Sequence, residues 1–210
     1  MGVLIKICGI NSVEAADAAC GAGADFAGLV FYSKSPRNLM LDQARALSAR
    51  MRGRTRLVAL FADAADDEIG TAIKLVEPDF VQLHGSEPPA RVADIRARFG
   101  VKAIKAFAIA QPSDFACIAG YDADMLLFDA KPADGAARPG GHGAAFDWQL
   151  LRGRSFSRPW LLAGGLSAQN VARAVGASGA PGVDVSSGVE TAPGIKSARM
   201  IGEFVRQARA

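Results

Sequence analysis

The chain has 210 residues, half of them hydrophobic, which suffices for the core of one large domain, so we interpret residues 1–210 as a single domain. Its 24 Lys and Arg and 21 Asp and Glu leave a formal charge of +3, far from the concentrated basic charge of a nucleic-acid-binding protein. This balance is compatible with a small anionic substrate. No stretch approaches the roughly 18 apolar residues of a membrane span, so we expect no membrane partner.

Short apolar runs alternate with longer amphipathic segments from one end of the chain to the other. The predicted strands are 3–8, 26–31, 56–61, 80–83, 103–107, 125–129, 160–163 and 183–185. The predicted helices are 12–22, 41–51, 65–76, 88–99, 112–119, 147–151, 167–175 and 197–208. Alternating elements of this kind predict an α/β fold with a parallel sheet, and eight pairs predict a single-domain (βα)8 TIM barrel. An open doubly wound sheet is the alternative, but no glycine-rich fingerprint follows the first strand.

Two local features stand out against this pattern. An aspartate precedes a predicted strand three times, at Asp25, Asp79 and Asp124, which suggests a repeated unit. The one long irregular segment is 131–145, and long loops without secondary structure are usually functional or mobile. His142 lies within it, and we expect its side chain to be solvated.

The three cysteines form an odd set without the spacing of metal ligands. Cys8, Cys20 and Cys117 therefore suggest neither a disulfide framework nor a zinc site, and we predict no metal and a reducing compartment. The N-terminus has no long apolar region with a cleavage site, so we expect a soluble, cytoplasmic protein.

Barrel active sites form at the carboxyl ends of the strands, so polar residues there are candidates for function. Cys8 ends the first strand, with Lys6 one layer below it, and a nearby cation can lower a thiol pKa toward the range of a base. A buried small hydrophobic residue is the alternative. Asp129 ends a very apolar run, where a carboxylate is costly unless it is paired or used. An acid at Asp129 and a base at Cys8 would suit an isomerisation by proton transfer.

Small-residue loops follow the last two strands, where such barrels commonly bind phosphate through backbone N–H groups. They contain Gly164 and Gly165 in the first loop and Ser186, Ser187 and Gly188, just after Asp184, in the second.

Other polar residues near strand ends are weaker candidates. Arg37 could pair with a substrate carboxylate or form a surface salt bridge. His84 could orient substrate, carry a proton or be structural. Lys105 could face the barrel mouth or extend from a barrel layer.

The chain resembles the phosphoribosylanthranilate isomerases of tryptophan biosynthesis along nearly its whole length. The matching motifs, in order, are KICG (6–9), GLVF (28–31), SPR (35–37), VQLHG (81–85), LFD (127–129), FDW (146–148), LAGGLSAQN (162–170), DVSSGVE (184–190) and PGIK (193–196). The chain departs from the family pattern at Asn11, where Thr is usual, and at Ser197, where Asp is common. The 140–143 segment, GGHG, also departs from the usual pattern.

The resemblance implies a reaction and its residues. It implies an Amadori rearrangement of N-(5-phosphoribosyl)anthranilate, with Cys8 as general base and Asp129 as general acid and with neither metal nor organic cofactor. It also implies that Arg37 contacts the anthranilate carboxylate and that the two small-residue loops bind phosphate. The family includes monomers and homodimers, and either state fits this chain.

Two other functions compete with this one. The related isomerase of histidine biosynthesis, or a dual-substrate version, uses two carboxylates and a second phosphate loop in the first half. Here Cys8 occupies the base position, and no such loop follows the third or fourth strand. A catalytically silent barrel that only binds a phosphorylated ligand is the other alternative.

Overall fold

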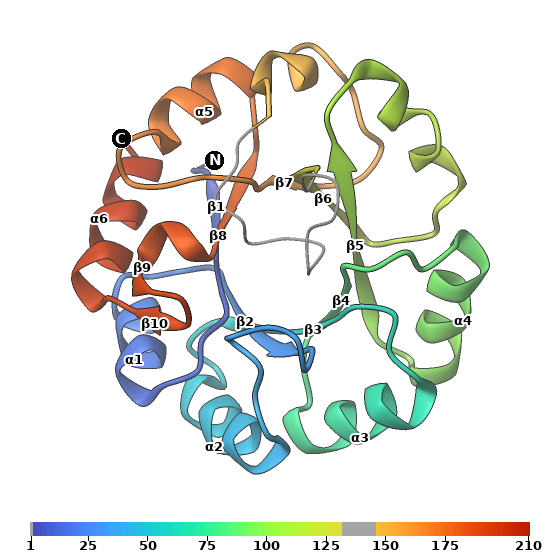
Figure 1. Ribbon diagram of the computed structural model, residues 1–210, viewed down its shortest axis with the longest axis vertical. Coiled ribbons are helices and arrows are strands. Elements are labelled where there is room, and N and C mark those ends of the chain that lie inside the picture. Colours follow the sequence, from blue (N-terminus) through green and yellow to red (C-terminus); the bar gives the residue numbers. More distant parts are fainter. Residues whose placement is uncertain (1, 132–145) are drawn as a thin grey trace.

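The computed structural model describes residues 2–131 and 146–210, and within them eight parallel strands form a closed barrel in sequence order (Figure 1). The strands are β1 Leu4–Cys8, β2 Phe26–Phe31, β3 Arg56–Phe61, β4 Phe80–Leu83, β5 Lys102–Ile109, β6 Met125–Ala130, β7 Trp160–Leu162 and β8 Gly182–Val185. The predicted (βα)8 barrel is confirmed. His142 and the rest of 132–145 lie outside the described residues.

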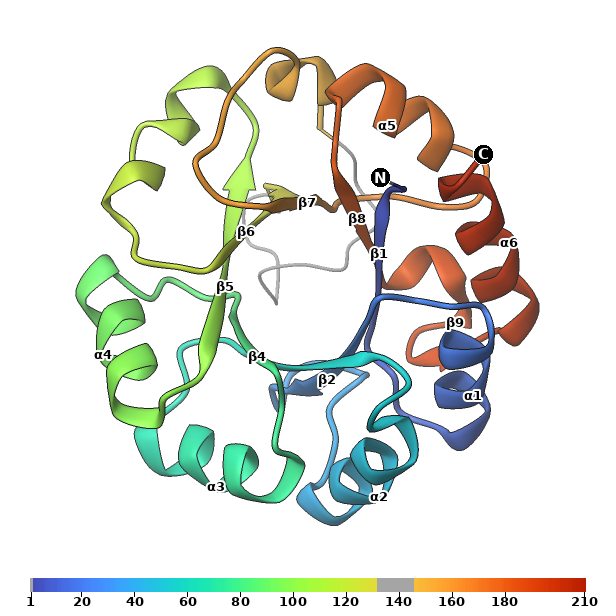
Figure 2. The ribbon, with the colours of Figure 1, turned by 180° about the vertical axis from the view of Figure 1, so that it is seen from behind.

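Helices form a ring outside the strands, visible from both faces (Figures 1 and 2). They are α1 Val13–Gly21, α2 Leu41–Met51, α3 Asp66–Val76, α4 Pro89–Phe99, α5 Val171–Ser178 and α6 Ala198–Ala208. Ser12 and Ser197 cap α1 and α6 by accepting backbone N–H bonds from Ala15 and Met200, so Ser197 serves as a cap where the family pattern has Asp. No helix in this described portion is long and apolar enough to cross a membrane.

The helices predicted at 112–119 and 147–151 are wrong. The first is a pair of 3₁₀ turns, η1 Pro112–Phe115 and η2 Ile118–Gly120, and the second is the turn η3 Trp148–Leu151. The Asp114 side chain accepts from the N–H groups of Ala110 and Gln111, which stabilises a turn locally in place of a helix. Phe115 then packs on Phe128 and Phe156.

Alternation along the strands separates two apolar layers. Ile5 and Ile7 of β1 belong to the large cluster between strands and helices, so Lys6 and Cys8 point into the barrel. A second cluster fills the barrel interior: Phe26, Val58, Phe80, Ile104, Ala106, Met125, Leu127, Leu161 and Ala163. Polar side chains at the carboxyl ends of these strands therefore lie directly above a packed apolar interior.

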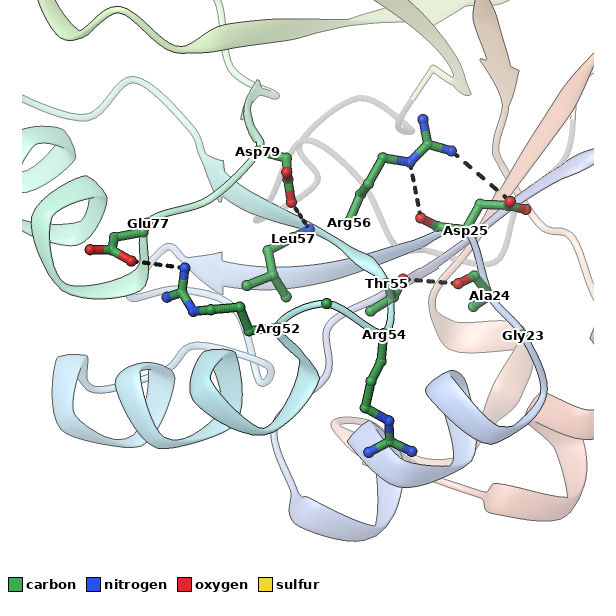
Figure 3. Close-up of a pocket in the computed structure, with 11 residues that line it drawn as sticks. Gly23, Ala24, Asp25, Arg52, Arg54, Thr55, Arg56, Leu57, Glu77 and Asp79 are labelled. Carbon is green, nitrogen blue, oxygen red and sulfur yellow. Dashed lines mark hydrogen bonds and ion pairs between the residues drawn. The ribbon is translucent and has the colours of Figure 1, made fainter.

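The aspartates that precede three strands share one role at the amino end of the barrel. Asp25, Asp79 and Asp124 accept hydrogen bonds from the backbone N–H groups of Ile5, Leu57 and Ala103, at 2.9, 2.7 and 2.8 Å, respectively. Each bond ties the residue before one strand to the start of the preceding strand (Figure 3 shows Asp79 with Leu57). The repeated aspartate therefore joins three pairs of neighbouring strands, β1 with β2, β3 with β4 and β5 with β6, on the face opposite the strand ends that carry the candidate site.

Candidate active site

The predicted site residues lie at or just beyond the carboxyl ends of six strands: Cys8 (β1), Arg37 (β2), His84 (β4), Asp129 (β6), Gly164 and Gly165 (β7), and Asp184, Ser186, Ser187 and Gly188 (β8). Because the strands are parallel, these ends share one face of the barrel. The closed topology thus gathers on one rim residues that are up to 180 positions apart in the chain.

Cys8 is buried beside an ion pair in the layer below it. Lys6 Nζ lies 2.8 Å from Asp184 Oδ1, and both side chains are buried. Burial raises the pKa of the Cys8 thiol, and the Asp184 carboxylate raises it further, while the positive charges of Lys6 and Lys196 oppose both effects. For Lys6, burial favours the neutral amine, but Asp184 and Cys8 outweigh it and raise the pKa. Asp184 thus neutralises the cation that would otherwise activate the thiol.

Gly28 of β2 provides the space for this arrangement. A Cβ at position 28 would lie 3.0 Å from Cys8 Sγ and 3.3 Å from Lys6 Nζ. A side chain there would press on the thiol and the ammonium together. No pattern in the sequence marked Gly28 for a role in the site, although the absence of a side chain there leaves the space that Cys8 and Lys6 occupy.

Asp129 is held in place by two contacts at the barrel mouth. Its Oδ1 accepts the N–H of Ala130 at 2.8 Å, and its Oδ2 lies 3.2 Å from His84 Nε2. The other ring nitrogen, Nδ1, lies 2.8 Å from Nε2 of Gln82, which is fully buried in β4. The structure therefore links the predicted acid to His84 and to Gln82, a residue without a role predicted from the sequence.

Arg37 is buried and already has a carboxylate partner. Its Nε and Nη2 donate to Oε1 and Oε2 of Glu190 at 2.7 and 2.8 Å, and Lys196 Nζ reaches the same Oε1 at 2.7 Å. Burial opposes ionisation of Glu190, but Arg37 and Lys196 outweigh it and hold the pKa of Glu190 below its usual range. Burial lowers the pKa of Lys196, against the attraction of Glu190. The fork of Nε and Nη2 is therefore committed to Glu190.

The hairpin that carries Glu190 and Lys196 was missed by the sequence patterns, because its strands β9 Glu190–Ala192 and β10 Ile195–Lys196 are very short. Asn11 Nδ2 donates to the carbonyl of Gly194 at 2.8 Å, which ties the hairpin to the loop after β1. Gly9 has a φ of 79°, and a Cβ there would lie 2.5 Å from Arg37 Cδ, so Gly9 lets the arginine pass.

The two small-residue loops after β7 and β8 touch one another. A Cβ on Gly188 would lie only 1.8 Å from the carbonyl oxygen of Leu166, and Gly164 and Gly165 have φ values of 86° and 61°. Ser186 Oγ donates to the carbonyl of Cys8 at 3.2 Å, which joins the second loop to β1. Close backbone packing of this kind requires glycine and brings peptide groups of both loops to one place.

A buried ion pair supports the loop after β4. Lys105 Nζ lies 2.7 Å from Glu87 Oε2 and donates to the carbonyl of Gly85 at 2.7 Å. Burial opposes ionisation of Glu87, but the charge of Lys105 outweighs it and lowers the pKa of Glu87. The Lys105 ammonium is neither free in the barrel mouth nor exposed to solvent. It binds the loop that follows His84.

A surface pocket of about 490 Å³ lies on the opposite face of the barrel (Figure 3). It is lined by the loops that enter β2, β3 and β4, and its arginines are paired: Arg52 Nη1 with Glu77 at 2.8 Å and Arg56 Nη2 with Asp25 at 4.0 Å. None of the candidate site residues lines it. The charged residues of this pocket therefore lie with the aspartates that join neighbouring strands at the amino end of the barrel.

The fold and the polar strand ends together define a (βα)8 barrel of the kind that carries an enzyme active site at its carboxyl-terminal face. The family model described as "N-(5'phosphoribosyl)anthranilate (PRA) isomerase" matches residues 5–207. The chain belongs to this family.

Individual relatives agree with the family match over the full length. An N-(5'-phosphoribosyl)anthranilate isomerase of Bradyrhizobium sp. (strain ORS 278) is 48% identical over 100% of this chain and 97% of its own. One from Cereibacter sphaeroides is 48% identical over 99% of both chains. The crystal structure of the Thermotoga maritima phosphoribosyl anthranilate isomerase superposes with a TM-score of 0.85 at 33% identity, covering 98% of each chain. A further structure similar to this chain (TM-score 0.84, 33% identity, 98% of each chain) is a complex with reduced 1-(o-carboxyphenylamino)-1-deoxyribulose 5-phosphate.

Proposed function

We propose that this protein is an enzyme that converts N-(5'-phosphoribosyl)anthranilate into 1-(2-carboxyphenylamino)-1-deoxyribulose 5-phosphate, a step of tryptophan biosynthesis. The observation that carries the proposal is the placement of a thiol and a carboxylate on the strand ends of β1 and β6, beside two touching glycine-containing loops, in a chain of this family.

Asp129 acts as the general acid and Cys8 as the general base. Asp129 donates its proton to the ring oxygen of the furanose as the bond from C1 to that oxygen breaks, and the anilino nitrogen forms a C=N bond to C1. Cys8, as the thiolate, removes the proton from C2, and the electrons of that C–H bond form C1=C2 while the C=N electrons return to nitrogen. The resulting enolamine tautomerises to the amino-ketose. The hydrogen bond from Ala130 N–H to Oδ1 supports this role, because it leaves Oδ2 as the oxygen that carries the proton.

The productive protonation state has a proton on Asp129 and none on Cys8. Burial and Asp184 raise the pKa of Cys8, so the thiol form dominates in the free protein at neutral pH. The iminium formed on ring opening places a positive charge next to the sulfur and stabilises the thiolate when it is needed. We therefore expect the ligand, more than Lys6, to activate Cys8.

The remaining predicted residues bind the substrate. Arg37 contacts the anthranilate carboxylate through Nη1, since Nε and Nη2 are committed to Glu190. The phosphate lies against the loops of Gly164, Gly165, Ser186, Ser187 and Gly188, which pack against each other at Gly188 and Leu166. Backbone N–H groups of loops in this position commonly bind phosphate. His84 and Asp184 lie nearer the sugar. The protein acts without metal or organic cofactor, in the cytoplasm, as a monomer or homodimer.

Turnover of freshly generated phosphoribosylanthranilate tests the proposal. We expect loss of the substrate signal at a rate that depends on enzyme concentration, with the amino-ketose phosphate formed in equal amount. Saturable binding of the product without any conversion of substrate would instead identify a silent barrel. Conversion of the larger two-phosphate substrate of histidine biosynthesis at a comparable kcat/KM would show a dual-substrate enzyme.

A further inference from the structure

Lys196 belongs to the buried group of charges that holds Arg37, but the proposed reaction gives it no task. Its Nζ lies 2.7 Å from Glu190 Oε1, and the same carboxylate accepts hydrogen bonds from Nε and Nη2 of Arg37 at 2.7 and 2.8 Å. The side chains of Arg37, Glu190 and Lys196 are 6%, 3% and 0% exposed. Water and salt therefore screen these three charges little.

The contacts of Lys196 Nζ fit an ammonium group. Besides Glu190 Oε1, Nζ donates to the carbonyl oxygen of Ser186 at 3.0 Å and to Ser186 Oγ at 3.3 Å. An ammonium group has three N–H donors, one for each of these oxygens, whereas a neutral amine has only two. Burial lowers the pKa of Lys196, but the Glu190 carboxylate opposes this fall. The geometry thus suits a charged Lys196 with every donor in use.

Lys196 changes the net charge around Arg37. An Arg37–Glu190 pair alone is neutral, and the Glu190 carboxylate offsets much of the attraction that the guanidinium exerts on another anion. With Lys196 the group has two positive charges and one negative charge, so its net charge is +1. The neighbouring Lys6–Asp184 pair adds no net charge. Such a site favours an anionic ligand group over a neutral one.

The hairpin of β9 and β10 fixes these groups beside Arg37. Glu190 Oε2 accepts the N–H of Gly194 at 3.2 Å, which closes the hairpin turn on the carboxylate. A Cβ on Gly194 would lie 2.5 Å from the carbonyl oxygen of Pro36, so the turn packs directly on the residue before Arg37. Glu190 and Lys196 are therefore held in place independently of any ligand.

We propose that Lys196 is a positioning residue that determines specificity: it cancels the charge of Glu190 and thereby lets the Arg37 guanidinium attract the carboxylate of the substrate. The inference rests on the proposed function, in which Arg37 binds that carboxylate. Lys196 acts through Glu190 and Arg37. A unit charge on the order of 10 Å from a ligand carboxylate, at an effective dielectric constant of about 20, changes the affinity by about tenfold.

The test compares two ligands that differ only in the carboxylate. One is the product of the proposed reaction, and the other is 1-phenylamino-1-deoxyribulose 5-phosphate, which lacks the carboxylate. The ratio of their dissociation constants, measured by calorimetry, reports the preference for the carboxylate. Both ligands carry the sugar and the phosphate, so any effect of Lys196 on the Ser186 loop cancels in this ratio. Binding is measured in place of turnover, because the charge of Lys196 also opposes the rise in the pKa of Cys8.

We expect the parent protein to bind the carboxylated ligand more tightly, and we expect Lys196→Met to reduce this preference about tenfold. Lys74→Met, at an exposed position on α3, is the matched control and should leave the preference unchanged. The double variant Glu190→Gln with Lys196→Met has the net charge of the parent group, so its preference should return to within about threefold of the parent. If Lys196→Met does not fold, Lys196→Gln replaces it, because this neutral side chain can still donate to Glu190.

The outcomes separate the inference from the function on which it rests. Equal weakening of both ligands in a folded Lys196→Met protein would identify a merely structural lysine and overturn the inference. A double variant with no more preference than the single variant would also overturn it. A parent protein that binds both ligands equally would overturn the inference together with the role of Arg37. A preference that follows the charge in a protein without turnover would support the inference and refute the proposed function.

Discussion

Replacing Asp184 by Asn should make the thiol of Cys8 more acidic. Asp184 lies 2.8 Å from Lys6 Nζ and raises the pKa of Cys8, both through its own charge and because it neutralises Lys6. In the Asp184→Asn protein, Lys6 is left beside Cys8 without its carboxylate partner. The buried ammonium is then best stabilised by a thiolate, so the pKa of Cys8 falls.

The size of the effect follows from Coulomb's law. Two unit charges about 4 Å apart interact by about 4 kcal/mol at an effective dielectric constant of about 20. Cys8 lies one layer above Lys6 and is farther from Asp184, so we take a third to two thirds of this energy as the effect of the Asp184 charge on the thiolate. That energy corresponds to a fall of about 1–2 units in the pKa of Cys8. The thiolate fraction at a fixed pH below the pKa then rises about 10- to 100-fold. Since a less basic thiolate is a weaker nucleophile, we expect alkylation to be about three- to tenfold faster.

The assay is the rate of alkylation by iodoacetamide as a function of pH. Cys20 and Cys117 are replaced by Ser first, which leaves Cys8 as the single thiol of the 210-residue chain. Asp67→Asn, at an exposed position on α3, is the matched control for the loss of one negative charge, and it should leave the rate unchanged. An alkylation midpoint that stays in place or moves to higher pH in Asp184→Asn would refute the electrostatic account of Cys8.

Three further substitutions test other parts of the structure. Asp79→Ala leaves the Leu57 N–H without its 2.7 Å partner and should lower the free energy of unfolding, measured in urea, by about 1–3 kcal/mol. An Asp67→Ala control should change that free energy by less than about 0.5 kcal/mol. Equal effects of the two substitutions would contradict a stabilising role for the bond between Asp79 and Leu57. Gly188→Ala puts a Cβ 1.8 Å from Leu166 O and should weaken inhibition by inorganic phosphate at least tenfold, and unchanged inhibition would exclude this loop from the phosphate site. Glu87→Gln breaks a buried pair and should cost about 3 kcal/mol at pH 7. Because the pKa of Glu87 is lowered on folding, the stabilisation from its ionised form is present above the ordinary pKa of Glu and is lost as the pH falls through the folded value. The free energies of unfolding of the two proteins in urea should therefore converge as the pH falls below the ordinary pKa of Glu, and a difference that stays constant would contradict the role of this ion pair.

The barrel could be predicted because its periodic signals are local. Eight apolar runs coincide with the eight strands, and the differences at their ends are one or two residues. The two helical predictions failed where side chains compete with the backbone. At 112–119, Asp114 satisfies two N–H groups before the helix can propagate, and a segment of this length has too few helical bonds to offset that competition.

The residues of the candidate site could be found one by one, but their partners could not. Cys8 and Asp129 stand out because each ends an apolar run. Gln82, Glu190 and Lys196 lie within the matching motifs, but nothing in the sequence indicates which side chains they contact. Glu190 contacts Arg37 across 153 positions, and this pairing depends on closure of the barrel between β8 and β1. Gln82 is a polar residue inside a buried strand of four residues, and this was the signal that could have marked it.

The most direct test of the acid and base assignment is single-turnover kinetics with phosphoribosylanthranilate deuterated at C2 of the ribose, in the parent, Cys8→Ala and Asp129→Asn proteins. We predict a primary isotope effect in the parent, a loss of at least about a hundredfold in the single-turnover rate constant of each variant, and product binding within about threefold of the parent in both. The loss follows because general acid or base catalysis contributes about 10²–10⁴ in rate. Folded variants that retain more than a tenth of the parental rate would contradict the central claim, which is that Cys8 removes the C2 proton and Asp129 protonates the ring oxygen.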